Sequence, residues 1–300
     1  MKDFEYLESK TLKELGKEFI EEFILPIPLR SNKKIASGFD RLDAVIGGFQ
    51  SSNLVLIGGE EGMGKTSFLI SLIRKMAIEK KFIIDFFSLK LTSKQITSII
   101  MSQQTKIPMD NFCSDKVSLE QGNTISKIIE EITNCKLKVY DYPFLTVSDI
   151  EEALLFYLPD YLQCVVIDYL QLVAIKKNDK VGKELNKREL SQITYQLKKL
   201  AKKLNITIIV TTNLKVKRNK KSFRPLLSDI RKQAPIDTFA DIVLLLYRPE
   251  YYKIDECDDE GRNPTTGEAE INIVKNNSGK TGQVRIKFEG QFGLFDNLTS

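Results

Sequence analysis

The sequence has 300 residues, of which 42% are apolar and 28% are charged, with a formal net charge of +5. This composition is typical of a globular protein and excludes a disordered chain. There is no histidine, which excludes an imidazole base, and none of the four cysteines has the spacing of a zinc site. No apolar run approaches the ~20 residues that cross a bilayer, and the charged N-terminus lacks a signal-peptide core. We therefore expect a cytoplasmic protein.

Residues 1–32 are expected to form a linker or docking segment ahead of one large domain, residues 33–300. Within this segment, residues 12–24 predict an amphipathic helix, because apolar side chains recur every three or four positions. Those side chains are Leu12, Leu15, Phe19 and Phe23. A segment this short cannot fold alone, so its apolar stripe must pack against something. The pattern leaves open whether that is its own domain or a neighbouring subunit.

Downstream of this segment, short apolar runs alternate with helical patterns. Strands are expected at residues 54–58, 82–87, 137–140, 164–168, 206–211, 242–246, 271–274 and 284–288. Helices are expected to begin near Lys65, Ser93, Ser118, Val147 and Glu184. Contiguous Ile, Val and Leu strands separated by helices predict an α/β fold with a mostly parallel sheet covered on both faces. The last strands lack a helix between them and predict an antiparallel edge. Residues 254–268, rich in Asp, Glu, Gly and Pro, predict a solvated loop.

Residues 59–66, GEEGMGKT, match the phosphate-binding pattern G-x-x-x-x-G-K-[ST] between an expected strand and an expected helix. Glycines let backbone N–H groups turn inward around phosphates, and a helix N-terminus adds partial positive charge. We expect Lys65 to reach the outer phosphates of ATP and Thr66 to ligate Mg²⁺. The strand and helix context disfavours a glycine-rich turn with a chance Lys-Thr pair. The expected nucleotide-binding residues are Gly59, Gly62, Gly64, Lys65, Thr66 and Ser67.

Asp168 ends the apolar run at residues 164–168. The carboxyl ends of parallel strands form the binding edge of such a sheet, so Asp168 suits a second contact to Mg²⁺, held through water. An aspartate at a strand end is also common without any function. The phosphate-binding pattern upstream favours the metal-binding interpretation.

The stretch IDYLQL at residues 167–172 closely resembles the corresponding part of the DnaB-type replicative DNA helicases. Four further stretches resemble the same family in order and spacing, over roughly residues 35–297: SGFDRLDAVIGGFQSSNLVLIGG, FSLKLTSKQ, RPLLSDIR with ADIVLLLYRPEYY, and VKNNSGKTGQVRIKF. The match is to the C-terminal RecA-like ATPase domain, and the family's separate primase-contacting domain is expected to be absent.

This resemblance implies a hexameric ring with ATP between subunits, single-stranded DNA in the centre, and other replication proteins as partners. It implies a linker helix that docks on the next subunit, which favours that alternative for residues 12–24. It also places central-channel loops at residues 174–187 and 214–224. Their basic residues are Lys176, Lys177, Lys180, Lys183 and Lys187 in the first, and Lys215, Lys217, Arg218, Lys220, Lys221 and Arg224 in the second. Such loops would track a phosphate backbone without reading bases; the alternative is a pair of solvated loops.

The chain departs from the resemblance at catalytic positions. The family's water-activating glutamate is replaced by Lys90, which is protonated at neutral pH and cannot accept a proton. The family's arginine finger, worth ~10³ to 10⁵ in rate, is replaced by Asn277, although the preceding Lys275 is kept. The family's phosphate-sensing glutamine is Asn213 here. Other residues could substitute: Glu60 or Glu61 as the base, and Lys280 or Arg285 as the finger.

Three functions are compatible with these features. The first is an ATP-dependent DNA helicase of the DnaB type, in which Lys65, Asp168 and Lys275 belong to the catalytic machinery. The second is a weakened relative that binds ATP and DNA without efficient hydrolysis, as a regulator, loader or mixed-ring partner. The third is a RecA-fold ATPase of another branch, such as a recombinase or a KaiC-like protein, which the IDYLQL and ADIVLLLYR stretches disfavour.

Overall fold

The structure is a computed structural model that describes Leu12 and residues 34–113, 118–156, 162–176, 184–215, 224–254 and 265–298. The chain divides into two units, Met1–Lys33 and Lys34–Ser300. The fold described below is that of the second unit. Apart from Leu12, the helix expected at residues 12–24 lies outside the described residues, so its docking stays a prediction.

A nine-stranded sheet among the described residues forms the centre of the second unit, in the order β11-β10-β9-β8-β1-β7-β5-β2-β3. The parallel part comprises β8 (Ile242–Tyr247), β1 (Leu54–Gly59), β7 (Thr207–Asn213), β5 (Cys164–Asp168), β2 (Ile84–Ser88) and β3 (Leu137–Tyr140). The antiparallel part comprises β9 (Glu268–Asn276), β10 (Gly282–Glu289) and β11 (Leu294–Asp296). A separate small sheet pairs β4 (Leu145–Thr146) with β6 (Val173–Ala174). The expected α/β fold with an antiparallel C-terminal edge is confirmed.

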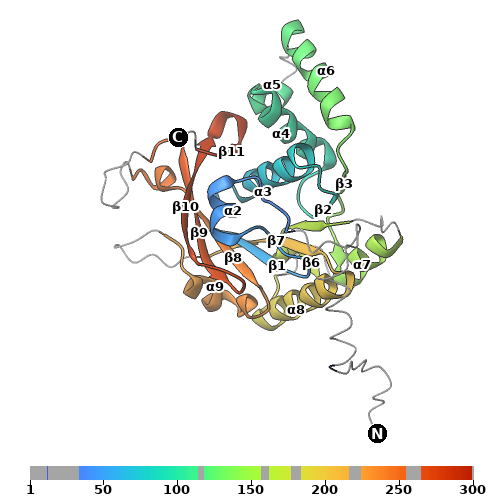
Figure 1. The fold of residues 1–300 in the computed structure, drawn as a ribbon, viewed down its shortest axis with the longest axis vertical. Helices are drawn as coiled ribbons and strands as arrows, with labels where there is room; N and C mark the ends of the chain where they lie inside the picture. Colours follow the sequence, from blue (N-terminus) through green and yellow to red (C-terminus); the bar gives the residue numbers. More distant parts are fainter. Residues whose placement is uncertain are drawn as a thin grey trace. The chain divides into compact units, whose positions relative to one another are not determined.

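Helices cover both faces of the sheet, which explains why strands such as β1 and β8 are apolar without alternation. In β1, Val55 and Ile57 join the core under one set of helices, whereas Leu54 and Leu56 join the core under the other. The first set is α2 (Asp40–Ile46), α3 (Lys65–Arg74) and α4 (Ser93–Thr105); the second is α7 (Val147–Phe156), α8 (Lys187–Leu204) and α9 (Leu227–Gln233). Figure 1 shows α3 and α4 on one side of the sheet and α7 and α8 on the other. No described helix has the length and apolar character that crossing a membrane requires.

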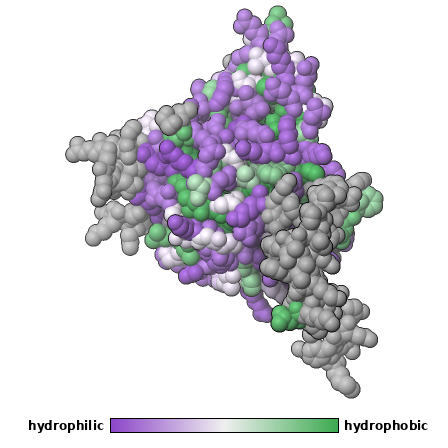
Figure 2. Space-filling model, in the orientation of Figure 1, coloured by the Kyte–Doolittle hydropathy of each residue, from purple (hydrophilic) through white to green (hydrophobic). Residues whose placement is uncertain are grey.

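Helices α5 (Met109–Cys113) and α6 (Leu119–Thr133) extend from the α4 side, at the top of Figure 1. No residue of α6 is buried; Ile132 packs on the core, whereas Leu119 and Ile129 are exposed. Figure 2 shows a mostly hydrophilic surface with scattered hydrophobic residues at this end of the unit. This isolated distribution is normal for a protein surface.

Most element boundaries agree with the expected ones, and the differences have local causes. The helix expected near Glu184 begins at Lys187, because the Asn186 side chain caps it by accepting from the N–H groups of Arg188 and Glu189. The elements α2, α9 and β11 were not expected. The loop expected at residues 254–268 ends one residue early, since Glu268 begins β9; its residues 255–264 lie outside the described part of the chain.

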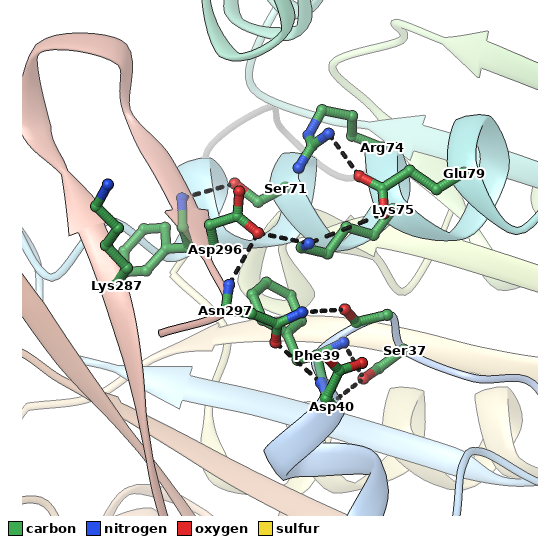
Figure 3. A network of polar contacts seen from close by, with 12 residues as sticks. Ser37, Phe39, Asp40, Ser71, Arg74, Lys75, Glu79, Lys287, Asp296 and Asn297 are labelled. Atoms are coloured by element: carbon green, nitrogen blue, oxygen red, sulfur yellow. Dashed lines mark hydrogen bonds and ion pairs between the residues drawn. The ribbon is translucent and has the colours of Figure 1, made fainter. Parts of the chain in front are cut away.

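The edge strand β11 is bonded to the helix that follows the expected phosphate-binding loop (Figure 3). Helix α3 continues into a π-helical turn, η1 (Lys75–Glu79), and the ammonium of Lys75 lies 2.6 Å from an Asp296 carboxylate oxygen in β11. Lys75 is almost fully buried, and its Nζ also lies 5.3 Å from the Phe39 ring centroid. A buried ion loses hydration, so Lys75 depends on these partners. The network therefore fixes β11 against α3.

Candidate nucleotide-binding site

The loop between β1 and α3 has the geometry of a phosphate cradle. Gly62 and Gly64 adopt left-handed conformations, with φ of 82° and 85°. The positive φ of Gly62 favours glycine, and a Cβ atom there would also lie 2.6 Å from the Tyr251 hydroxyl. Alternating right- and left-handed residues turn successive N–H groups to one side, and α3 begins directly after Gly64. The loop and the helix start therefore present N–H donors to a common point.

Lys65 lies inside this loop and is 9% exposed. Its Nζ donates to the Glu60 carbonyl oxygen at 2.7 Å. Burial lowers the pKa of Lys65 to about 8; the Asp168 carboxylate acts in the opposite direction, and the charge of Lys90 lowers it further. A phosphate chain beside Lys65 would favour the protonated form. The site thus holds a cation whose charge an anionic ligand would stabilise.

Thr66 and Asp168 come together at the end of the sheet. The Thr66 hydroxyl donates to one Asp168 carboxylate oxygen at 2.8 Å, and Thr211 in β7 donates to the other. Asp168 is 2% exposed. Hydroxyl and carboxylate oxygens are the hard ligands that Mg²⁺ takes, so this pair fits the ion. Within the described part of the chain, no group of three His, Cys, Asp or Glu side chains could hold a metal. Mg²⁺ would therefore take its remaining ligands from phosphate and water.

Gly59 and Ser67, the other expected nucleotide-binding residues, direct no side chain into the loop. A Cβ at Gly59 would lie 3.3 Å from Cγ of Lys65, so glycine leaves room for the lysine stem at the end of β1. The Ser67 hydroxyl faces Gly293, where a Cβ would lie 3.3 Å away, so its side chain points away from the loop. Its N–H belongs to the first turn of α3, where donors lack a partner within the helix.

Lys90 and Asn213 lie at the same edge of the sheet. Ser88 pairs with Asp168, and the Leu89 N–H donates to the Asp168 carbonyl at 2.9 Å, so Lys90 leaves the sheet beside Asp168. Asn213 ends β7 in register with Gly59. Asn213 therefore lies next to the loop after β1, whereas Lys90 lies two strands further along the edge.

Three contacts at this edge were not expected from the sequence. The Gln171 side chain bonds both backbone groups of Asn213, at 3.2 and 3.3 Å. The Tyr252 hydroxyl donates to a Glu60 carboxylate oxygen at 2.6 Å, and Tyr251 covers Gly62. Gln171 lies within IDYLQL, and the tyrosines lie within ADIVLLLYRPEYY. The motifs were therefore the available signal, but the partners lie too far along the chain to be identified from it.

Lys275 and Asn277 lie at the opposite edge of the sheet. Because β9 runs antiparallel to β8, Asn276 pairs with Ile242, which in turn pairs with Val55 near the start of β1. The Lys275 ammonium donates to the Asp237 carbonyl at 2.8 Å, and the Asn277 N–H donates to the Asp241 carbonyl at 2.9 Å. Within one chain these residues do not meet Lys65, which follows the other end of β1.

The possible substitutes for the base and the finger differ in their surroundings. The Glu60 carboxylate is engaged by Tyr252, whereas Glu61 is exposed. Arg285 lies 2.7 Å from a Glu268 carboxylate oxygen in the neighbouring strand. Lys280 is exposed in the turn between β9 and β10, at the edge that carries Asn277.

The described ends of the two basic stretches meet at the phosphate edge. The Lys215 ammonium lies 3.2 Å from a Glu184 carboxylate oxygen, which joins the start of the second stretch to the first. A cavity of about 660 Å³ opens beside them, with Tyr169 and Asn213 in its wall. Arg224 instead binds the buried Glu270 through two bonds of 2.8 and 2.9 Å. Lys176 and Lys187 are exposed. The remaining residues lie outside the described part of the chain: Lys177, Lys180, Lys183, Lys217, Arg218, Lys220 and Lys221.

Known proteins resemble this chain over most of its length. The model of the DnaB-like helicase C terminal domain matches residues 34–297. A probable replicative DNA helicase of Trieres chinensis is 30% identical over 288 residues, which cover 93% of this chain and 61% of that protein. The replicative DNA helicase DnaB of Geobacillus stearothermophilus is 30% identical over 266 residues, which cover 88% of this chain and 56% of that protein. The chain thus spans less than two thirds of the length of these relatives.

Solved structures show the same fold. One solved ATPase domain superimposes with a TM-score of 0.80 at 27% identity, over 97% of this chain and 100% of that one. A DnaB-like replicative helicase, described with its interactions with primase, superimposes with a TM-score of 0.80 at 27% identity, over 96% of this chain and 69% of that one. The chain therefore belongs to the DnaB-like helicase family, of which it carries the C-terminal ATPase domain.

Proposed function

We propose that this chain binds Mg²⁺-ATP and acts on single-stranded DNA as one subunit of a hexameric helicase ring. The observation that carries the proposal is the bond of 2.8 Å between Thr66 and Asp168, beside the buried ammonium of Lys65. It joins the start of α3 to the end of β5, and so brings a hydroxyl, a carboxylate and a cation to one point of the sheet edge. These are the groups that hold a metal-bound triphosphate.

Each residue of the site has a distinct task in this proposal. The N–H groups around Gly62 and Gly64 bind the phosphates, and Lys65 neutralises the outer ones. Thr66 and Asp168 hold Mg²⁺, with Asp168 acting through water. When bound, the ion neutralises charge on the phosphates and orients them. Thr211 keeps Asp168 in position by donating to its second oxygen.

DNA binding is proposed for the two basic stretches, residues 174–187 and 214–224. They follow β6 and β7, and the contact between Glu184 and Lys215 joins their described ends next to the nucleotide edge. Both stretches therefore begin or end beside the strands that carry the proposed nucleotide site. Their lysines suit a backbone that is bound without regard to sequence.

Assembly into a ring is proposed through residues 1–32. The apolar stripe of Leu12, Leu15, Phe19 and Phe23 calls for a partner surface, and a neighbouring subunit would provide it. Deletion of residues 1–30 is expected to shift the protein toward the monomer in light scattering, with ATP opposing the shift. A full-length chain that stays monomeric with ATP at every concentration would contradict ring assembly.

A second candidate function is that of a weakened relative, which binds ATP and DNA but hydrolyses ATP poorly. It is favoured by Lys90, which follows β2 where the family has its glutamate, and by Asn277 at the hairpin between β9 and β10. Binding and chemistry are separable, because only contacts formed in the transition state accelerate the reaction. The engagement of Glu60 by Tyr252 and of Arg285 by Glu268 favours this candidate further.

The rate of ATP turnover per site, measured with and without single-stranded DNA, distinguishes the two candidates. Loss of a positioned base costs ~10²- to 10⁴-fold, so we expect binding with slow turnover and little stimulation by DNA. Rapid, DNA-stimulated turnover would instead establish the active helicase. Alanine variants of Glu61 and Lys280 would then show which residue had replaced the base or the finger.

A further inference from the structure

We infer that Lys90 is a phosphate-binding residue: with Lys65, its ammonium binds the terminal phosphate of a nucleoside triphosphate and so distinguishes it from a diphosphate. The inference rests on the nucleotide site proposed above and assigns a role to the side chain that stands in place of a base. It concerns binding and does not depend on hydrolysis.

The first support is the position of Lys90 along the sheet edge. Strands β1, β7, β5 and β2 follow one another in that order. Lys65 follows β1, Asp168 ends β5, and Lys90 follows β2. Lys90 therefore lies beyond the proposed metal ligand, on the side away from the phosphate loop. A phosphate chain that starts at the loop reaches this side only with its terminal group.

The second support is the local contact that holds the side chain there. The Leu89 N–H donates to the Asp168 carbonyl at 2.9 Å, which fixes the backbone before Lys90. The Lys90 ammonium lies 6.0 Å from the centroid of the Tyr169 ring, within the range of a cation–π attraction. Tyr169 directly follows Asp168, so the ring orients the ammonium beside the site. Tyr169 is thus a positioning residue.

The third support is electrostatic. Lys65 and Lys90 follow strands whose carboxyl ends lie along the same edge of the sheet. Two ammonium groups facing one edge repel each other, and a phosphate with several charges between them removes that repulsion. A further lysine of this segment, Lys94, is also exposed, but it lies in the first turn of α4 and not at the end of β2. Lys94 therefore provides a matched control.

The test compares the affinities of a non-hydrolysable ATP analogue and of ADP, each with Mg²⁺ and with EDTA, by titration calorimetry. In Lys90→Gln we expect the triphosphate to bind about tenfold more weakly and ADP to bind within about twofold of the wild type, because a charged hydrogen bond is lost only for the longer ligand. The triphosphate should lose more affinity in EDTA than with Mg²⁺, since the second cation then carries more of the neutralisation. Lys94→Gln should change neither ligand.

Tyr169 gives a second, independent measurement. Tyr169→Leu should lower the preference for triphosphate over diphosphate about threefold by releasing the ammonium, whereas Tyr169→Phe should keep it, because phenylalanine retains the ring face. A purely structural role for Tyr169 would weaken both ligands equally and leave their ratio unchanged.

The outcomes separate failure of this inference from failure of the proposed function. If the wild type binds both nucleotides and Lys90→Gln changes neither affinity, or both equally, Lys90 is a solvated lysine and the inference is wrong. If the wild type binds neither nucleotide, the nucleotide site itself is wrong and the inference falls with it.

Discussion

The carboxyl ends and the amino ends of the parallel strands form two opposite edges of the sheet, and these edges differ in the residues that they bring together. At the edge where β1 and β5 end, Lys65, Thr66 and Asp168 lie in one cluster with a bond of 2.8 Å between the last two. At the opposite edge, the hairpin after β9 carries Lys275 and Asn277, both bonded to backbone carbonyls of their own chain. The first edge gathers the groups of the proposed nucleotide site. The second has no partner site within the described part of its chain.

This difference separates two kinds of chemistry. Under the proposed function, one subunit supplies the phosphate-binding groups, whereas a residue at the hairpin would act on the site of another subunit. Substitution at Asn277 therefore leaves the binding edge intact, and a chain can keep affinity while it loses rate. The same separation allows each edge to be tested alone.

The largest effect is expected from restoring both catalytic positions, in Lys90→Glu with Asn277→Arg. Turnover at saturating ATP should rise about 10²-fold or more, because a base and a finger each contribute at least that much in related sites. Asn277 is exposed, so arginine fits. The measurement is phosphate release per site, with each single variant as a control; the singles should gain less, since the two groups act as a unit. No gain in the double variant would show that another group limits the reaction.

The next effect is on the binding edge alone. Lys65→Ala should weaken Mg²⁺-ATP binding about 10²-fold, because a buried charged hydrogen bond to phosphate is lost. Calorimetry measures the affinity, and circular dichroism checks the fold. Lys80→Ala is the matched control, since Lys80 is exposed at the end of η1. Equal affinity of Lys65→Ala and the wild type would mean that the site is misplaced.

The third prediction concerns the basic stretch at residues 214–224, which is proposed to bind single-stranded DNA. Replacement by glutamine of four basic residues, Lys217, Arg218, Lys220 and Lys221, should lower the affinity for single-stranded DNA of any sequence about tenfold. The dependence on salt should also flatten, because each lost phosphate contact lowers the slope by ~0.7. Fluorescence anisotropy at several salt concentrations measures both. Neutralisation of Lys199 and Lys202 on α8 serves as the control. An unchanged slope in the fourfold variant would identify the loop as merely solvated.

The smallest functional effect is expected from Asp296→Asn, which alters the sheet end but neither edge site. Lys75 would stay buried beside a neutral partner, so unfolding should cost about 2 kcal/mol less at pH 7, below the usual range for a buried pair because Asp296 is a third exposed. Nucleotide affinity should not change. Glu120→Gln on α6 is a control of equal charge change. Denaturant unfolding measures the loss, and a variant as stable as the wild type would show that the pair is dispensable.

The pH dependence of this loss has a definite sign. Burial raises the pKa of Asp296, but the hydrogen bonds from Lys75 and from the Asn297 N–H, together with the charges of Lys75 and Arg74, hold that pKa below its usual value. A carboxylate with a lowered folded-state pKa stabilises the fold above the unfolded pKa of ~3.9 and loses that contribution as the pH falls. The difference in stability between wild type and Asp296→Asn should therefore be full at pH 7 and shrink below about pH 4. A difference that stays constant through acid would contradict the ion pair.

The sequence predicted those parts of the fold that depend on local pattern. Strand β5, Cys164–Asp168, lies at the predicted residues because both its faces are buried and its run is uniformly apolar. Helix α8 begins three residues after the expected start at Glu184, because Asn186 and Glu189 form a capping box that sets its N-terminus. Strand β11 is three residues long and depends on contacts with β10 and Lys75. Local propensity carries no signal for an element stabilised in this way.

The site divides in the same manner. The phosphate loop could be recognised because its glycines, lysine and threonine are contiguous, and a single turn positions them all. The engagement of Glu60 by Tyr252 and of Asn213 by Gln171 joins residues from different strands, and only the folded chain reveals it. Asn277 lies at the far edge because β9 runs antiparallel to β8. The sequence predicted this direction, since no helical pattern separates the last strands.

The first and last segments of the second unit are hydrogen-bonded to each other. The Asp40 N–H donates to the Asn297 side-chain oxygen at 2.9 Å, and the Asn297 amide donates to the Gly38 carbonyl at 3.1 Å. The two ends of this unit are therefore held together by the same hydrogen bonds, and the unit forms a closed cassette, that is, a domain whose chain termini are adjacent. Such a cassette suits circular permutation, because a short peptide can bridge its ends without disturbing the core. Chain segments attached at Gly38 and at Asn297 therefore leave this unit from neighbouring points on its surface.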